Sequence, residues 1–156
     1  NDVTLEDIAR IADVFYIGGT KVGAMFGEAV VFTHGNMPKN FVTLVKQHGA
    51  LLAKGWLLGV QFDTLFTDDL YCGIARHAND AADRIREVLV ERGYTLTFDA
   101  PTNQIFITLD NATSERLQRN VRLGFMEKAD DTHTVMRICT SWATTDEQVE
   151  QLIALL

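Results

Sequence analysis

The residue most suggestive of chemistry is Lys21, which ends the segment Gly18-Gly-Thr-Lys21. A lysine amine becomes a useful nucleophile when desolvation or a neighbouring cation lowers its pKa, and it then forms a Schiff base with a carbonyl group. Flanking glycines let the backbone approach a bulky planar or phosphorylated ligand, and Thr20 adds a hydroxyl beside the amine. The same residues also fit a hairpin turn with a solvated lysine, and their spacing alone favours that turn.

Apolar runs on both sides of the lysine predict two strands that flank the glycine loop. The first strand is Val14-Phe-Tyr-Ile17, and the second covers residues 28–33. The preceding Thr4-Leu-Glu-Asp7 has the spacing of a capping box and predicts a helix of about two turns. Because two strands and a short helix cannot cover both faces of a sheet, residues 1–36 are expected to need a sheet from elsewhere.

The remaining chain predicts helices first and then a mixed unit. From Phe41 to Phe66 apolar residues recur at helical intervals, interrupted by glycines. A further helix begins after Asp68 or Asp69 and runs to about Arg92, where Gly93 stops it. The sequence from about residue 70 onward predicts a self-sufficient α+β unit. Its strands are expected at 94–98, 104–109, 124–126 and 133–139, with a helix at 112–121. A capping box at Thr145-Asp-Glu-Gln148 is expected to begin the last helix.

Composition narrows the class of protein. The chain is 47% hydrophobic, and its 14 basic and 21 acidic residues give a net charge of −7, without the basic patch that binds nucleic acid or an anionic membrane. The longest apolar stretches are shorter than the roughly 20 residues that span a bilayer. The histidines have no ligand-like spacing, so no metal site is expected. Cys72 and Cys139 each lie in an apolar segment and are expected to be reduced core thiols of a cytoplasmic protein.

Several segments, in order along the chain, are similar to one enzyme family. The run Tyr16-Ile-Gly-Gly-Thr-Lys-Val-Gly-Ala24, followed by Gly27-Glu-Ala-Val-Val31, resembles the lysine region of the threonine aldolase and β-eliminating lyase family. Members of that family are pyridoxal-phosphate enzymes with the aspartate aminotransferase type of fold. The similarity continues through Lys46–Gly49, Lys54–Gly55, Ala75–Asn79, Ala81–Ala82, Thr102–Gln104 and Met136–Thr144, and it covers essentially all 156 residues.

The resemblance implies a fold and a division of the chain. The fold class is α/β, corresponding to the C-terminal part of a fold-type-I pyridoxal-phosphate enzyme: the end of the large-domain sheet plus a small α+β C-terminal domain. Residues 1–66 are expected to be the remnant of the large cofactor-binding domain, with the lysine loop and a linking helix. Residues 67–156 are expected to be the small domain.

The resemblance also implies roles for four residues. Lys21 is expected to form the Schiff base with pyridoxal 5'-phosphate, with Thr20 near the cofactor. Arg137 matches the arginine that holds the α-carboxylate of the amino-acid substrate, a role suited to the rigid fork of a guanidinium. Lys54 is a candidate to reach the cofactor phosphate, within one subunit or across a subunit interface, and it equally fits a solvated helix position.

The groups that stack on the pyridine ring, pair with its nitrogen and bind its phosphate lie upstream of the lysine in the family. We therefore expect this chain to be the C-terminal part of a longer enzyme, itself inactive or nearly so. The activity expected of the whole enzyme is retro-aldol cleavage of a β-hydroxy amino acid to glycine and an aldehyde, in a homodimer or homotetramer. The alternatives are β-elimination from an aromatic or sulfur amino acid, and a non-catalytic α+β binding or dimerisation module.

Overall fold

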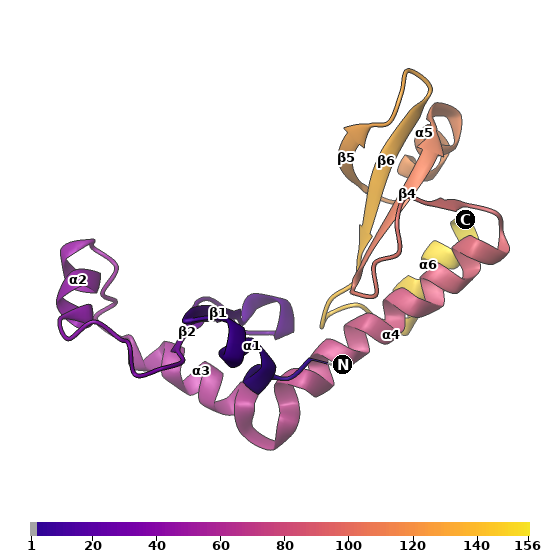
Figure 1. Ribbon diagram of the computed structural model, residues 1–156. Coiled ribbons are helices and arrows are strands. Elements are labelled where there is room, and N and C mark those ends of the chain that lie inside the picture. Colours follow the sequence, from indigo (N-terminus) through magenta and orange to yellow (C-terminus); the bar gives the residue numbers. More distant parts are fainter. Residues whose placement is uncertain (1–2) are drawn as a thin grey trace. The chain divides into compact units, whose positions relative to one another are not determined.

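A computed structural model describes residues 3–156 and divides the chain into two compact units, Asn1–Tyr71 and Cys72–Leu156. Figure 1 labels most of the helices and strands of both units. None of the helices in the described residues is long and apolar enough to cross a membrane.

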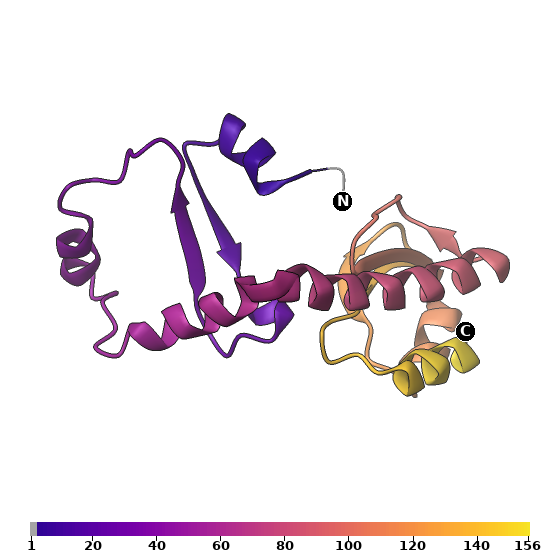
Figure 2. The ribbon, with the colours of Figure 1, turned by 90° about the horizontal axis from the view of Figure 1, so that it is seen from below.

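The first unit begins with a capped helix and a hairpin. Helix α1 (Leu5–Ile11) starts after Thr4, whose hydroxyl accepts a hydrogen bond from the Asp7 amide at 3.2 Å while its own amide donates to the Asp7 carboxylate at 3.0 Å. Strand β1 (Val14–Gly18) then pairs antiparallel with β2 (Glu28–Phe32), side by side in Figure 2. The predicted capping box and both predicted strands are confirmed.

The helical segment that follows is broken. Helix α2 (Phe41–Gln47) and helix α3 (Trp56–Phe66) are separated by eight residues, so the prediction of one helical segment from Phe41 to Phe66 is wrong between them. Gly49 adopts a φ of +70°, which ends α2 in the left-handed conformation that glycine adopts without steric cost. A short turn, η2 (Thr67–Asp69), joins α3 to the next helix.

The first unit buries little apolar surface of its own. Among its described residues, the buried apolar side chains are Val22, Phe62 and Leu65. The hairpin leaves Tyr16 68% exposed, and α3 leaves Trp56 64% exposed. The described residues give this sheet two strands only, in line with the expectation that residues 1–36 need further structure to cover them.

The second unit is an antiparallel sheet with helices on one face. Its strand order is β3-β4-β6-β5, and β4 and β6 pair in register from Gln104 opposite Cys139 to Asp110 opposite His133. Gly93, with a φ of +79°, follows the long helix and confirms the predicted stop. The elements from the long helix onward are α4 (Leu70–Glu91), β3 (Thr95–Leu96), β4 (Gln104–Asp110), α5 (Asn111–Gln118), β5 (Gly124–Lys128), β6 (His133–Cys139) and α6 (Asp146–Leu155).

Side-chain alternation divides this sheet into a helix-covered face and an outer face. The helix-covered face packs against the core residues of α4, α5 and α6, and it includes Ile105, Ile107, Met136 and Ile138. The outer face carries Gln104, Phe106 and Thr108 of β4 with Val135, Arg137 and Cys139 of β6. The second capping box is confirmed, because the Thr145 hydroxyl accepts from the Gln148 amide at 3.2 Å and opens α6.

Both cysteines are exposed, so the prediction of core thiols is wrong. Cys139 ends β6 on the outer face, where helices do not cover it. Cys72 lies near the start of α4, ahead of the buried residues of that helix, which begin at Ala78. Apolar sequence neighbours indicate a strand or helix here, but the face on which each thiol lies decides its burial.

Candidate active site

Lys21 lies in a tight turn between the two strands of the hairpin. The turn is η1 (Thr20–Val22), and Lys21 and Thr20 are exposed in it while Val22 is buried. The Gly19 carbonyl accepts hydrogen bonds from the amides of Val22 and Ala24, both at 3.0 Å. The buried valine and these two bonds fix the backbone, so the turn presents the Lys21 amine to solvent from a defined position.

Two side chains from the helices hold the strand ends beside this turn. Gln61 of α3 accepts a hydrogen bond from the Met25 amide at 2.7 Å and donates to the Phe26 carbonyl at 3.3 Å. The Tyr71 hydroxyl donates to the Gly18 carbonyl at 2.9 Å. The loop is therefore fixed before and after Lys21 by residues that lie 35 to 53 positions away in the sequence.

Two glycines of the loop are required by its geometry. A Cβ at Gly19 would lie 2.7 Å from the Ala24 Cβ and 3.0 Å from the Phe62 ring. Gly27 has a φ of +93°, and a Cβ there would lie 2.1 Å from a Leu58 methyl group. By contrast, a Cβ at Gly18 would meet no atom within 4 Å, so the surface beside the lysine turn is open to an approaching ligand.

Substituting Gly27 with alanine is expected to destabilise the first unit by about 1–3 kcal/mol, because alanine is strained at this positive φ and the Leu58 methyl group must move. The free energy of unfolding is measured in urea by the fluorescence of Trp56, in a Trp142→Phe background. Gly59→Ala is the matched control: it lies inside α3 with no atom within 4 Å of the added Cβ, so it should not destabilise the unit. Equal stabilities of the two variants would contradict this account of the loop.

Lys54 lies in the first unit, in the segment that precedes α3. Its side chain is exposed, and its carbonyl accepts a hydrogen bond from the Leu57 amide at 3.0 Å in the first turn of that helix. It is therefore a surface residue outside the regular part of the helix, and its contact with a cofactor phosphate stays a prediction.

Arg137 lies on the outer face of the second unit, at the centre of β6. Its neighbours in register are Phe106 on β4 and Gly124 on β5. Its Nη1 donates to the Gln104 Oε1 at 3.1 Å, while its Nε is buried and, in the part of the chain that the structure describes, has no hydrogen-bond partner. A buried donor without a partner costs roughly 1–3 kcal/mol, and this nitrogen therefore has hydrogen-bonding capacity that the described residues do not use.

Three hydrogen bonds fix the ends of the strands that carry Gln104 and Arg137. The Thr140 amide donates to the Asn103 carbonyl at 3.0 Å, and the Asn103 side-chain amide returns a bond to the Thr140 carbonyl at 2.7 Å. The buried Thr140 hydroxyl donates to the Ala78 carbonyl of α4 at 2.6 Å. The sequence did not predict these roles, although Asn103 and Thr140 both fall within segments that resemble the family.

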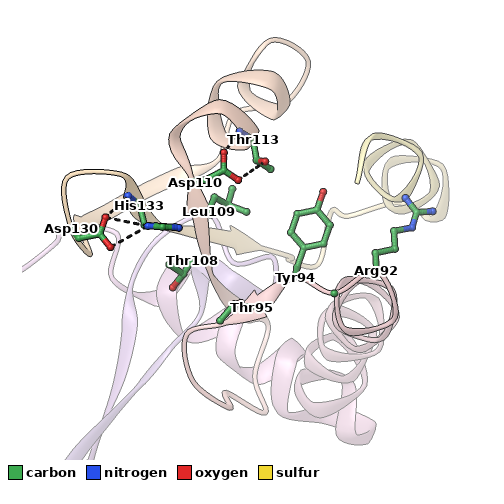
Figure 3. A pocket seen from close by; sticks show the side chains of 10 residues that line it. Arg92, Tyr94, Thr95, Thr108, Leu109, Asp110, Thr113, Asp130 and His133 are labelled. Carbon is green, nitrogen blue, oxygen red and sulfur yellow. Dashed lines mark hydrogen bonds and ion pairs between the residues drawn. The ribbon is translucent and has the colours of Figure 1, made fainter.

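The second unit also has a hollow of about 550 Å³, which contains none of the predicted site residues. Figure 3 shows two bonded pairs among the residues that line it, Asp130 with His133 and Asp110 with Thr113. Both carboxylates have local structural roles, Asp130 in the β5–β6 turn and Asp110 as the N-cap of α5. Hydrogen bonds from the side chain and amide of Thr132 and from His133 hold the pKa of Asp130 far below its ordinary 3.8. The Thr113 amide and hydroxyl lower the pKa of Asp110.

The lowered pKa of Asp130 predicts an acid-dependent stability of the β5–β6 turn. Because its folded-state pKa lies below 3.8, the ionised carboxylate stabilises the fold above about pH 3.8, and that contribution is lost as the pH falls toward the folded-state value. Asp130→Asn should lower the urea midpoint at pH 7 and reduce its change between pH 7 and pH 3. The control, Asp131→Asn, should keep the wild-type pH dependence. A wild-type pH dependence in Asp130→Asn would be the contrary result.

No protein-family model matches the chain. Low-specificity L-threonine aldolases are similar in sequence: that of Pseudomonas aeruginosa is 30% identical over 141 residues, and that of a Pseudomonas species is 29% identical over 143. These matches cover 90% and 91% of this chain, which spans 40% of the length of each of the two relatives.

Solved structures show the same relationship. A threonine aldolase from Leishmania major is 40% identical and matches with a TM-score of 0.94. The match covers 99% of this chain and 45% of the chain of the aldolase. A serine palmitoyltransferase from Sphingomonas wittichii shares the fold, with a TM-score of 0.64 and 18% sequence identity. This match covers 96% of this chain and 40% of the chain of the transferase. The predicted fold class is confirmed: the chain is α/β and matches a C-terminal part of longer fold-type-I enzymes. Over nearly its whole length, the chain is therefore similar to a C-terminal part of threonine aldolases.

Proposed function

We propose that this chain is part of a pyridoxal-phosphate-dependent lyase that cleaves a β-hydroxy amino acid of the L-threonine type to glycine and an aldehyde. The observation that carries the proposal is the fixed, glycine-rich turn that presents Lys21 to solvent, in a chain 40% identical to a threonine aldolase over nearly its whole length. A loop that served only as a hairpin connection would not need a polar side chain from α3 and a tyrosine hydroxyl to fix it.

The residues present fit the cofactor. Lys21 has an exposed amine on a fixed backbone, and the surface at Gly18 is open for a planar ring. When bound, pyridoxal phosphate supplies an electron sink for the charge that develops as a bond to the substrate α-carbon breaks. Lys21 would hold the cofactor through its Nζ, and its amine would be available to accept or return a proton.

The other candidate residues are proposed to bind and orient the cofactor and the substrate. The Thr20 hydroxyl lies beside Lys21 in the same turn and is available as a hydrogen-bond partner for the cofactor. Lys54 is proposed to supply a cation to the cofactor phosphate, within one subunit or across an interface. Arg137 is proposed to bind the substrate α-carboxylate, which the buried, unpartnered Nε supports because the guanidinium retains donors for an anion.

We propose that the exposed apolar side chains of the first unit are covered by the rest of a longer chain and by a second subunit. Exposed apolar side chains occur on both the hairpin and α3, with Tyr16, Trp56 and Val60 among them, and large exposed apolar surface is typical of an interface. Gly55 and Gly59 at the start of α3 suit the close approach of another backbone.

The proposal is tested by supplying L-threonine and cofactor to the full-length protein that contains this chain and measuring glycine and acetaldehyde. Stoichiometric formation of both products is the expected result, with little or none from the 156-residue chain by itself. Release of pyruvate and ammonia from an aromatic or sulfur amino acid, without cleavage of threonine, would show β-elimination instead. No visible absorbance and no turnover of either class would indicate a non-catalytic module.

A further inference from the structure

The Gln104 side chain accepts a hydrogen bond from the guanidinium of Arg137. Gln104 is the first residue of β4 and lies directly opposite Cys139, so Arg137 is its diagonal neighbour across the β4–β6 ladder. Long side chains reach one another across such a diagonal, and the Gln104 Oε1 accepts from the Arg137 Nη1 at 3.1 Å. One end of the guanidinium is thus held by an amide oxygen.

The backbone that carries this amide is held firmly. The neighbouring Asn103 exchanges two hydrogen bonds with Thr140, at 3.0 and 2.7 Å, and thereby ties the start of β4 to the chain just after β6. The Gln104 amide itself donates to the Thr102 hydroxyl at 3.3 Å. The acceptor for Arg137 therefore comes from a strand end with little freedom to move.

The side chain that accepts from Arg137 is neutral, as are the groups that accept from Arg92 and Arg116. In the described residues, Arg10, Arg84 and Arg86 form ion pairs with carboxylates, whereas the hydrogen bond of Arg137 is made to an amide. A carboxylate at position 104 would neutralise the guanidinium and compete with an incoming anion. An amide oxygen orients the group but leaves its positive charge available.

We infer that Gln104 is a positioning residue that fixes the Arg137 guanidinium, without neutralising it, for the carboxylate of the substrate; this inference rests on the proposed function of Arg137. Gln104 acts through Arg137 and does not itself touch the substrate. A polar pair that served only to stabilise the sheet would tolerate a glutamate, because the resulting ion pair would link the strands equally well.

The first test is kinetic and uses the full-length protein. Gln104→Met has a similar volume but no acceptor, and it should raise KM for L-threonine by about 5- to 10-fold with kcat within about 2-fold, as expected for the loss of ground-state orientation. Gln104→Glu should raise KM further, by roughly 30-fold or more, because it pairs with Arg137. Gln118→Glu, the same chemical change at an exposed position of α5, is the matched control and should leave KM unchanged.

The second test needs no activity and uses the 156-residue chain. Nitrogen-15 NMR of the arginine side chains, assigned with Arg137→Lys, reports rotation of the guanidinium. Separate Nη1 and Nη2 signals are expected for Arg137 in the wild type. These signals should merge in Gln104→Met and remain separate in Gln104→Glu. Titration with acetate, compared with acetamide as the uncharged control, should shift the Arg137 Nε signal in the wild type and require more acetate in both variants.

The two tests separate failure of this inference from failure of the proposed function. An unchanged KM in Gln104→Glu, or unchanged Nη signals in Gln104→Met, overturns the positioning role even if the wild-type protein cleaves threonine. If the wild-type protein cleaves no amino acid but acetate binding to Arg137 still weakens in both variants, the proposed function is wrong, whereas Gln104 positions Arg137 for a carboxylate as inferred.

Discussion

Lys21→Ala is expected to lower threonine cleavage by the full-length protein by about 10³-fold or more, since in the proposed function this residue carries the cofactor and moves protons. The variant should also lose the visible absorbance of the lysine-bound cofactor. Because Lys21 is exposed and Val22 and the Gly19 carbonyl maintain the turn, the fold should be retained, with a stability change within about 0.5 kcal/mol. Activity, absorbance and the free energy of unfolding are measured on the same preparation.

Lys39→Ala is the matched control for this prediction. Lys39 is an exposed lysine of the same unit, in the segment before α2, and it has no role in the proposed site. Its removal should change neither the activity nor the absorbance. A Lys21→Ala protein that keeps its colour and cleaves threonine at the wild-type rate would show that another amine carries the cofactor.

Arg137→Ala should have the second-largest effect, a rise in KM for L-threonine of about 10²-fold, which corresponds to roughly 3 kcal/mol of lost charge-assisted hydrogen bonding. Arg137→Lys keeps the charge but loses the planar fork, so its KM should rise by an intermediate amount, about 10-fold. A smaller decrease in kcat is expected, because the carboxylate is bound in both the ground state and the transition state.

Arg119→Lys serves as the control for the arginine substitution. Arg119 is exposed and follows the last residue of α5, where exchange for lysine should leave KM unchanged. The substrate-binding role of Arg137 is contradicted if Arg137→Ala keeps a wild-type KM, or if its KM is equally raised for threonine and for an analogue in which the carboxylate is an amide.

The parts of the fold that the sequence predicted correctly depend on local signals. Thr4 and Thr145 each precede a residue that returns the hydrogen bond three positions later, so each capping box lies within four residues. The strands at Val14–Gly18 and Glu28–Phe32 have continuous β-forming residues, and the glycines between them break the pattern. These features need no knowledge of the tertiary structure.

The errors in the fold arose where a local pattern admits more than one arrangement. Apolar spacing from Phe41 to Phe66 has a helical period, but the period does not reveal that Gly49 turns the chain out of α2. The apolar neighbours of Cys139 correctly indicated a strand, yet the thiol lies on the outer face of the sheet, since burial depends on which face the helices cover.

The candidate site could be predicted only in part for the same reason. Lys21 and Arg137 were found through the resemblance, and their roles stay predictions. Gln104 could not be connected to Arg137, because the two are 33 residues apart and their contact depends on the register of β4 against β6. Likewise, the bond between Gln61 and the lysine loop depends on how α3 packs on the hairpin.

The most direct test of the central claim, that Lys21 carries the cofactor, is reduction of the full-length protein with borohydride in the presence of pyridoxal phosphate, followed by peptide mapping. Reduction fixes a pyridoxyl group on the amine that holds the cofactor. We expect the label on the peptide that contains Lys21, and its loss in Lys21→Ala but not in Lys39→Ala. A label confined to Lys39, Lys46 or Lys54, or no label on any lysine, would contradict the account.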